Sequence, residues 1–325
     1  MESILEKSMP GARKVLTMCL NTQPGEKVAI LSDQESPLVV AEALFYAALE
    51  IGAHPAVILG EGPKFAGDDP GCFSIDAIDS ADVILCPTKK TYFHTTAVKR
   101  ALSRGARCLV LSECDDRILF EGGINADFVE LNEKVVQPLV PIWQNGKTIH
   151  MTTPGGTDLT ASIDGRDVQI DNGLMHTPGA GAGVPDVELC ISPVEGSANG
   201  TVVVDASCST IGLISEPIRI TVENGFATKI EGGREARELI ARIEETNDPN
   251  SYNLAEMAIG LNPEARLCGI IIEDEGKYGT CHCALGNSTC LAGKRWAPIH
   301  LDMVQKCPTV EIDGKVIMKD GKLTF

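Results

Sequence analysis

Residues 27–33 read KVAILSD and residues 36–53 read SPLVVAEALFYAALEIGA, and together these two stretches set the architecture of the first part of the chain. The first has the length and β-branched content of a buried strand. The second has a helix start at Ser36-Pro37 and a helix stop at Gly52. Three further apolar runs follow, HPAVILG at 54–60, DVILCP at 82–87 and RCLVLS at 107–112. Strands that alternate with helices predict a doubly wound parallel sheet. No GxGxxG follows the first strand, which disfavours a dinucleotide site.

After about Trp143 the sequence changes to short segments of alternating polar and apolar residues, such as PIRITVENGFATKIEGG at 217–233. Such alternation predicts half-buried, antiparallel strands. Tight hairpins are predicted at four turn signals, Asp164-Gly165, Asn224-Gly225, Asp313-Gly314 and Asp320-Gly321. One long helix is predicted from Arg234 to Thr246, and GAGAGVP at 179–185 is interpreted as a flexible loop. We therefore predict two domains, an α/β parallel-sheet domain at residues 1–140 and a β-rich, metal-binding catalytic domain at residues 141–325.

The composition restricts the partners that this chain can bind. It has 28 Lys and Arg against 45 Asp and Glu among 325 residues, a formal net charge of -17. Such a surface repels phosphate backbones and anionic membranes, so we expect neither nucleic acid nor a membrane as partner and favour a small molecule. The sequence has neither a long apolar run nor a signal pattern, which predicts a cytoplasmic protein. We also expect a homo-oligomer.

Twelve cysteines are many for a cytoplasmic chain. They form no CxxC pair, and Cys281, Cys283 and Cys290 around His282 match no standard spacing of a zinc or iron-sulfur site. We therefore expect reduced, mostly buried thiols.

Candidate metal ligands gather in the second half of the chain. His300 and Asp302 in PIHLDMV have the i, i+2 spacing that places two side chains on one face of an extended segment. His282 lies in YGTCHCALGN, and Glu188 and Glu256 each lie among apolar residues. A buried carboxylate is costly unless a cation balances its charge. Imidazole with carboxylate is the ligand set expected for zinc, manganese, cobalt or iron.

Four segments in this order resemble the metal-site motifs of the aminopeptidase T and aminopeptidase S family. They are PDVELCISP at 185–193, NLAEMAIGLNP at 253–263, EDEGKYGTCHCALGN at 273–287 and PIHLDMV at 298–304. The resemblance implies five metal ligands, Glu188, Glu256, His282, His300 and Asp302. It also implies a metallopeptidase fold. The family has a tyrosine seven positions after its ligand histidine, and Thr289 stands there in this chain.

A second resemblance, to the 2,5-dihydroxypyridine dioxygenases, covers the chain more evenly. It rests on ISEPIRITVENGFATKIEGGREARELIARIEETNDPNSY at 214–252, on GLNP, on AGKR at 292–295 and on the HLD core. Those enzymes open an aromatic ring with one ferrous ion. The match to their substrate-pocket histidine is His94. Their iron-binding histidine before HxD corresponds to Glu256, and their more distant glutamate ligand falls near Asp171.

These features predict a hydrolase that depends on a divalent metal and has its site in a cleft between the two domains. The metal would activate water and polarise a carbonyl, Glu256 or Glu188 would act as base, and His94 would orient the substrate. Glu275 stays a further candidate. The predicted substrate is a peptide or a small cyclic ketone, diketone or lactam that is opened by water. An iron dioxygenase and a binding protein without activity are the alternatives.

Overall fold

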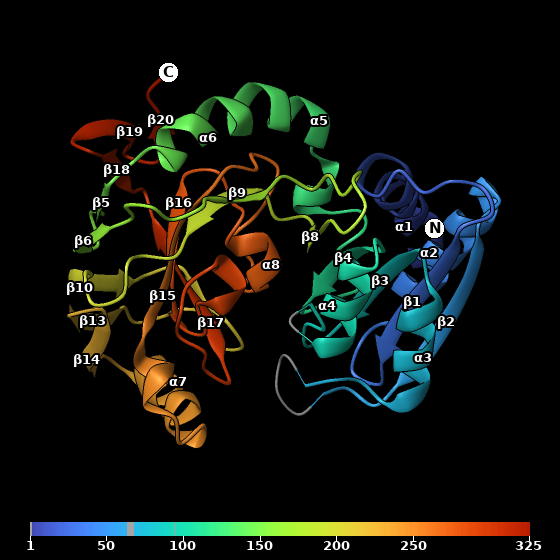
Figure 1. Ribbon diagram of the computed structural model, residues 1–325, viewed down its shortest axis with the longest axis horizontal. Coiled ribbons are helices and arrows are strands. Elements are labelled where there is room, and N and C mark those ends of the chain that lie inside the picture. Colours follow the sequence, from blue (N-terminus) through green and yellow to red (C-terminus); the bar gives the residue numbers. More distant parts are fainter. Residues whose placement is uncertain (1, 64–67, 94) are drawn as a thin grey trace. The chain divides into compact units, whose positions relative to one another are not determined.

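The computed structural model describes residues 2–63, 68–93 and 95–325. The chain forms two compact units, one of Met1–Val129 with Asn172–Pro185 and the other of Glu130–Asp171 with Asp186–Phe325 (Figure 1). His94, the predicted substrate-orienting residue, lies outside the described residues.

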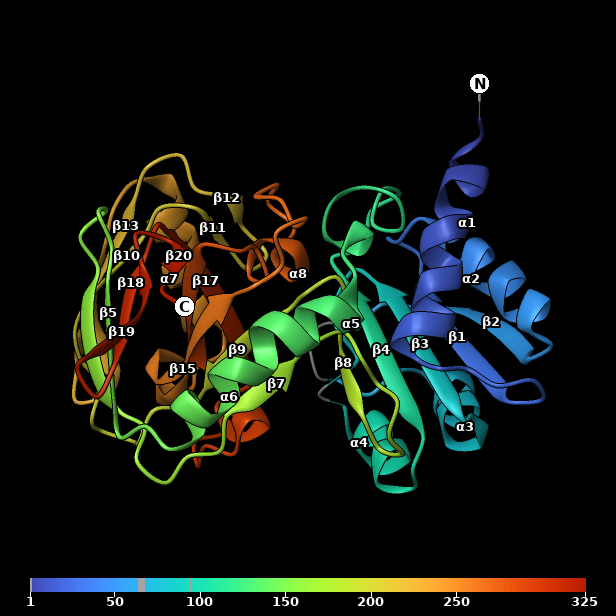
Figure 2. The same cartoon turned by 90° about the horizontal axis from the view of Figure 1, so that it is seen from above.

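The first unit is built on a parallel sheet with the strand order β2-β1-β3-β4-β8. Its strands are β1 (Lys27–Asp33), β2 (His54–Gly60), β3 (Val83–Thr88), β4 (Arg107–Ser112) and β8 (Gly181–Gly183). The helical segments of this unit are α1 (Ile4–Lys14), η1 (Val15–Cys19), α2 (Leu38–Ile51), α3 (Cys72–Ser80), α4 (Thr96–Ser103) and η2 (Gly122–Asn125). Helix α1 packs on α2, and α3 packs on α4 (Figure 2). The predicted doubly wound sheet is confirmed, and α2 ends, as predicted, at Gly52 with a left-handed φ of 85°.

The segment 172–185 returns to the first unit, so the structure does not divide the chain at one boundary near residue 140. Within it, Gly181–Gly183 forms β8, which pairs in parallel with Cys108–Val110 of β4. The expected flexible loop at 179–185 is thus partly a strand. Glycine allows this close pairing, because a Cβ at Gly181 would lie 2.7 Å from the ring of Phe93. The residue composition does not indicate that segment 172–185 returns to the first unit, because the strand Gly-Ala-Gly lacks the β-branched and aromatic residues typical of strands.

The second unit contains two sheets whose paired strands are antiparallel. The first has the order β14-β13-β10-β6-β5-β18-β19-β20 and the second the order β12-β11-β17-β16-β15-β9-β7. The strands of the first sheet are β5 (Thr148–Thr152), β6 (Asp158–Ser162), β10 (Asn199–Val204), β13 (Ile218–Glu223), β14 (Phe226–Glu231), β18 (Thr309–Ile312), β19 (Lys315–Lys319) and β20 (Lys322–Leu323). The strands of the second are β7 (Gln169–Asp171), β9 (Glu188–Ile191), β11 (Ser207–Cys208), β12 (Gly212–Leu213), β15 (Leu254–Gly260), β16 (Thr280–Gly286) and β17 (His300–Lys306).

Short helical segments connect these strands. They are α5 (Phe128–Leu131), which leads into the second unit, η3 (Asn132–Val136), α6 (Gln137–Gln144), α7 (Arg234–Glu245), η4 (Pro249–Tyr252), α8 (Ile271–Asp274) and η5 (Thr289–Leu291). Helix α7 agrees with the helix predicted from the sequence. In the part of the chain that the structure describes, every helix is too short or too polar to cross a membrane.

Three of the four predicted hairpins are confirmed. Asn224-Gly225, Asp313-Gly314 and Asp320-Gly321 each have two successive positive φ angles and join β13 to β14, β18 to β19 and β19 to β20. The prediction at Asp164-Gly165 is wrong. That turn connects β6 to β7, which belong to different sheets, and only Gly165 has a positive φ.

Candidate metal centre

The five predicted ligands lie on four neighbouring strands of the second sheet, β9, β15, β16 and β17 (Figure 1). Side chains alternate between the two faces of a strand, and the pairing places all five on one face. Residues next to them in sequence, such as Leu189, Met257 and Met303, point to the opposite face and are buried in the core. A β-bulge between Leu254 and Glu256 inserts one residue into β15. From Glu256 to Ile259 the register is regular, so alternation places Glu256 on the ligand face, and the bulge turns the preceding Leu254 to the other face.

Small residues opposite the ligands leave room for their side chains. Ala258 of β15 stands opposite His282, and Ala284 of β16 stands opposite both Glu256 and Asp302. Gly286 stands opposite His300. Larger side chains at these positions would fill the space that the ligands occupy. The small residues in AEMAIG at 255–260 and CHCALG at 281–286 therefore leave space for a metal centre on this face of the sheet.

The ligand atoms converge closely. His282 Nε2 lies 3.1 Å from Glu188 Oε2 and 3.5 Å from Glu256 Oε1. His300 Nε2 lies 2.9 Å from Glu256 Oε2 and 3.1 Å from Asp302 Oδ1. The five side chains thus form two donor groups, Glu188–Glu256–His282 and Glu256–His300–Asp302, and within each group the donor atoms lie within 4.8 Å of one another. Both groups share Glu256.

Hydrogen bonds from outside the groups orient two of the ligands. His300 Nδ1 lies 2.8 Å from the Asn287 carbonyl oxygen, to which it can donate, and this leaves Nε2 directed at the carboxylates. The Ser209 hydroxyl is 3.3 Å from Asp302 Oδ2 and accepts a hydrogen bond from the Asp302 amide at 3.0 Å. Partners of this kind fix the ring orientation and the basicity of metal ligands.

The centre concentrates buried negative charge. Glu188, Glu256 and His282 are each at most 5% exposed. Burial raises the pKa of Glu188 well above its ordinary value, and the charges of Asp186 and Glu256 raise it further. Burial acts in the same direction on Glu256, but hydrogen bonds from His282 and His300 outweigh it and lower that pKa. Burial opposes the charged form of His300, yet Asp302 and Cys290 more than offset it and raise the pKa of His300.

Two buried atoms at the centre have no hydrogen-bond partner among the described residues, Glu188 Oε2 and His282 Nδ1. Glu188 Oε2 does lie within ion-pair distance of His282 Nε2, although without hydrogen-bond geometry. Orphaned buried polar atoms are costly, and a cation in contact with Glu188 Oε2 would remove the cost of that oxygen. Carboxylates and imidazoles are ligands of divalent ions such as zinc, iron, cobalt and manganese. The residues present therefore fit a divalent metal ion.

Sequence reasoning missed Cys190 and Asp186 near the ligands, named Asp171 only through the resemblance to the dioxygenases and left Glu275 as a candidate. Glu275 shares a third donor group with His282 and Asp302, while Asp171 and Cys190 share a fourth with Glu188. Asp186 lies against the loop at Gly276, where a Cβ would approach Asp186 Oδ1 to 2.5 Å. Glu275 carried a local signal, the acidic run before YGTCH, and Asp186 and Cys190 each lie two residues from Glu188, a spacing that could have indicated them. The position of Asp171 depends on the pairing of β7 with β9, which the sequence does not reveal.

Thr289 stands at the start of η5, where its hydroxyl bonds Asn287 Oδ1 at 2.7 Å. It therefore takes part in a local turn. Lys277 donates to the Pro263 carbonyl oxygen at 3.2 Å and so also stabilises a local turn.

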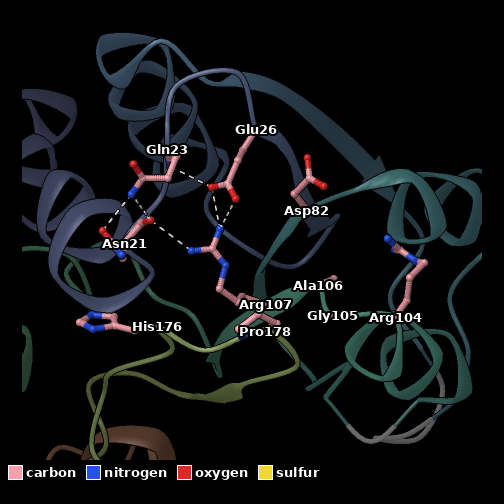
Figure 3. A pocket seen from close by; sticks show the side chains of 10 residues that line it. All are labelled: Asn21, Gln23, Glu26, Asp82, Arg104, Gly105, Ala106, Arg107, His176 and Pro178. Carbon is pink, nitrogen blue, oxygen red and sulfur yellow. Dashed lines mark hydrogen bonds and ion pairs between the residues drawn. The ribbon is translucent and has the colours of Figure 1, made fainter.

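A separate polar pocket of about 350 Å³ lies in the first unit (Figure 3). Its floor includes Arg107, which donates to both carboxylate oxygens of Glu26 at 2.5 and 2.6 Å and to the carbonyl oxygens of Leu20 and Asn21. Arg104 likewise donates hydrogen bonds to the carbonyl oxygens of Ile78 and Ala81. The pocket lies at the amino ends of β1 and β4, whereas open α/β sheets bind ligands at the carboxyl ends of their strands. We assign it a structural role.

We expect the metal-free protein to lose stability as the pH rises. Burial raises the pKa of Asp171 from 3.8 to about 6, and the pKa values of Glu188, Asp186 and Glu275 are raised as well. A carboxyl whose pKa is higher in the folded chain contributes stability that is full below its unfolded pKa and is lost as the pH rises through its folded pKa. The melting temperature of chelator-treated protein should therefore fall from about pH 4 to about pH 6 and beyond.

A divalent ion favours the ionised carboxylates, so its stabilising effect should grow over the same pH range. Thermal melts with and without added metal across this range check both expectations. A metal-free melting temperature that rises from pH 4 to pH 6 would contradict the buried carboxyl cluster.

Comparison with known proteins supports the fold and the enzymatic character of the chain. A sequence model of the 2,5-dihydroxypyridine 5,6-dioxygenase family matches residues 8–325. The 2,5-dihydroxypyridine 5,6-dioxygenase of Pseudomonas putida is 25% identical over 286 residues, which span 82% of this chain and 79% of that protein.

Two solved structures share the fold. The 2,5-dihydroxypyridine dioxygenase from Pseudomonas putida KT2440 superposes with a TM-score of 0.83 at 21% identity and covers 100% of this chain and 98% of its own. Wild-type AmpT from Thermus thermophilus superposes with a TM-score of 0.73 at 16% identity and covers 99% of this chain and 100% of its own. At these identities the likeness is one of fold, so the expected relation to aminopeptidase T is supported at that level alone.

These relatives and the donor groups agree with the sequence prediction of a divalent metal ion as cofactor. Two of the relatives are named as dioxygenases, the solved structures share the fold, and the family match extends over nearly the whole chain. The chain belongs to the 2,5-dihydroxypyridine 5,6-dioxygenase family.

Proposed function

We propose that this chain is a metal-dependent enzyme that opens the ring of a small heteroaromatic or cyclic carbonyl compound. Two observations support the proposal. The family model spans residues 8–325, and Glu188, Glu256, His282, His300 and Asp302 converge on one face of a buried sheet. The first candidate reaction is oxygen-dependent cleavage of a dihydroxypyridine-like ring, and the family relationship carries it.

The roles of the chain's own residues follow from their positions. Glu188, Glu256, His282, His300 and Asp302 would hold the divalent ion, whose charge polarises an oxygen substituent of the ring. Ser209 and the Asn287 carbonyl keep Asp302 and His300 in position. Glu275 is more exposed than Glu188, Glu256 and His282, and it stands beside His282 and Asp302. Of these carboxylates it is the best placed to exchange a proton with solvent. His94 remains our proposed residue for orienting the substrate.

Hydrolytic ring opening is the second candidate, and the composition of the donor groups favours it. Iron oxygenases commonly use two histidines and one carboxylate around one ion. In the described part of the chain, each of the two main groups instead combines one histidine with two carboxylates, and His282 and His300 share no group. Carboxylate-rich sites suit Lewis-acid activation of water, with Glu256 or Glu188 as the base. Peptide hydrolysis has the resemblance of four motifs to the aminopeptidase T family and the likeness of fold to AmpT in its support.

Oxygen dependence separates the two candidates. The protein is loaded with ferrous iron, or with zinc, cobalt or manganese, and is given 2,5-dihydroxypyridine and a cyclic diketone with and without oxygen. For the first candidate we expect turnover of the pyridine with iron alone, with label from isotopic oxygen gas in the product. Turnover that persists without oxygen and takes its label from water would establish the hydrolytic reaction. Inactivity on both compounds with every metal would contradict the proposed substrate class.

A further inference from the structure

A donor group that contains a thiol adjoins the proposed centre. The group consists of Asp171, Glu188 and Cys190, whose donor atoms lie within 4.8 Å of one another. Strand pairing brings the three together, because β7 runs beside β9 with Asp171 opposite Glu188 and Gln169 opposite Cys190. Glu188 and Cys190 are two residues apart on β9, so both side chains point to the ligand face.

Two features distinguish this group from an ordinary acidic cluster. Glu188 is 5% exposed, and its Oε2 atom has no hydrogen-bond partner among the described residues. Cys190 is 1% exposed and adds a sulfur donor to two carboxylates. A buried oxygen without a hydrogen bond beside a second carboxylate is a costly arrangement in the absence of a cation. The group therefore has the composition of a metal position.

We propose that Cys190 is a sulfur ligand of the metal centre and forms, with Asp171 and Glu188, a donor position that selects thiophilic divalent ions such as zinc and cobalt over manganese and magnesium. The inference rests on the metal centre of the proposed function and specifies its ligand chemistry. Thiolate ligands favour softer ions, whereas a site of carboxylates alone favours hard ones. One sulfur at the end of a carboxylate-rich centre would shift the preference of the whole centre.

Metal-bound cysteine is a thiolate, so formation of the sulfur–metal bond would release the thiol proton to solvent.

The same sheet supplies a matched control. Cys281 is fully buried, like Cys190, but precedes His282 on β16 and so points to the opposite face. Its thiol lies 3.3 Å from Gln305 Oε1, a partner that a serine hydroxyl can keep. Cys290 is a second useful comparison, because its sulfur lies 4.0 Å from His300 Nδ1 on the other side of the centre.

The test uses the full chain, stripped of metal and reloaded with cobalt alone. We expect the near-ultraviolet charge-transfer absorption of a cobalt–thiolate bond in the wild-type protein. It should be absent in Cys190→Ser and retained in Cys281→Ser and Cys290→Ser. The ratio of zinc affinity to manganese affinity should fall in Cys190→Ser by at least roughly 10-fold, the lower end of the loss seen when a partner of a metal ligand is removed. Thermal melting confirms that each variant is folded.

A measurement without any substitution covers the case in which Cys190→Ser fails to fold. X-ray absorption at the zinc edge of the wild-type protein should show a sulfur neighbour at about 2.3 Å. Cobalt that binds without thiolate absorption, absorption that survives in Cys190→Ser, or absorption lost only in Cys290→Ser would overturn the assignment of Cys190 and leave the proposed function standing. Failure of the wild-type protein to bind cobalt or zinc while it binds ferrous iron would overturn the assignment of Cys190, and failure to bind any of the three ions would overturn the proposed function as well.

Discussion

Replacing Glu256 by glutamine should empty the centre of metal while the protein stays folded. Glu256 is the carboxylate shared by both main donor groups, with Oε1 3.5 Å from His282 Nε2 and Oε2 2.9 Å from His300 Nε2. An amide of the same shape carries no charge and leaves each group with one carboxylate. The affinity loss should exceed the roughly 10- to 100-fold typical of removing a residue that only supports a metal ligand. Activity should disappear with the metal.

Metal analysis after dialysis, with a thermal melt of the same sample, checks this expectation. Glu223→Gln is the matched control, because Glu223 is an exposed residue of β13 in the other sheet. It should keep the wild-type metal content. If Glu256→Gln retained full metal at wild-type affinity, Glu256 would not be a ligand, and the two donor groups would not describe the site.

Replacing His300 by alanine should weaken metal binding less completely than replacing Glu256 by glutamine. The substitution removes the imidazole from Glu256–His300–Asp302 but leaves the donors of Glu188–Glu256–His282 in place. We therefore expect loss of most of the metal at limiting concentration and a weaker residual site. A centre of two ions would keep about half of its metal, since one of the two main groups survives, whereas a single shared ion would be lost almost completely. The titration thus also reports how many ions bind.

His150→Ala is the control for this variant. His150 lies on β5 of the other sheet and pairs with Asp158 at 2.8 Å. Loss of its imidazole should leave the metal content unchanged. Full metal occupancy in His300→Ala would show that the HxD pair is a structural contact within β17 and does not bind the ion.

Local patterns in the sequence predict strands, helix ends and turns of this protein, because each of these features depends mainly on the residues within it. KVAILSD, HPAVILG and RCLVLS are strands β1, β2 and β4 with the predicted limits, and Gly52 ends α2 because glycine adopts the left-handed conformation there at little cost. The spacing of His300 and Asp302 likewise places both side chains on one face of β17, where they lie 3.1 Å apart. The five ligands themselves come from the resemblance of four short motifs to a known family.

Tertiary structure alone determines which residues that are far apart in the sequence meet in space. The return of 172–185 to the first unit, the alignment of Glu256 with its two histidines and the meeting of Asp171 with Glu188 all depend on strand pairing. Pairing between distant strands is set by which surfaces bury each other, and a short strand carries too little pattern to reveal its neighbour. The sequence thus indicated five candidate ligands of the proposed metal centre. The register of the sheet decided that Glu256 joins two histidines and that Asp171 meets Glu188.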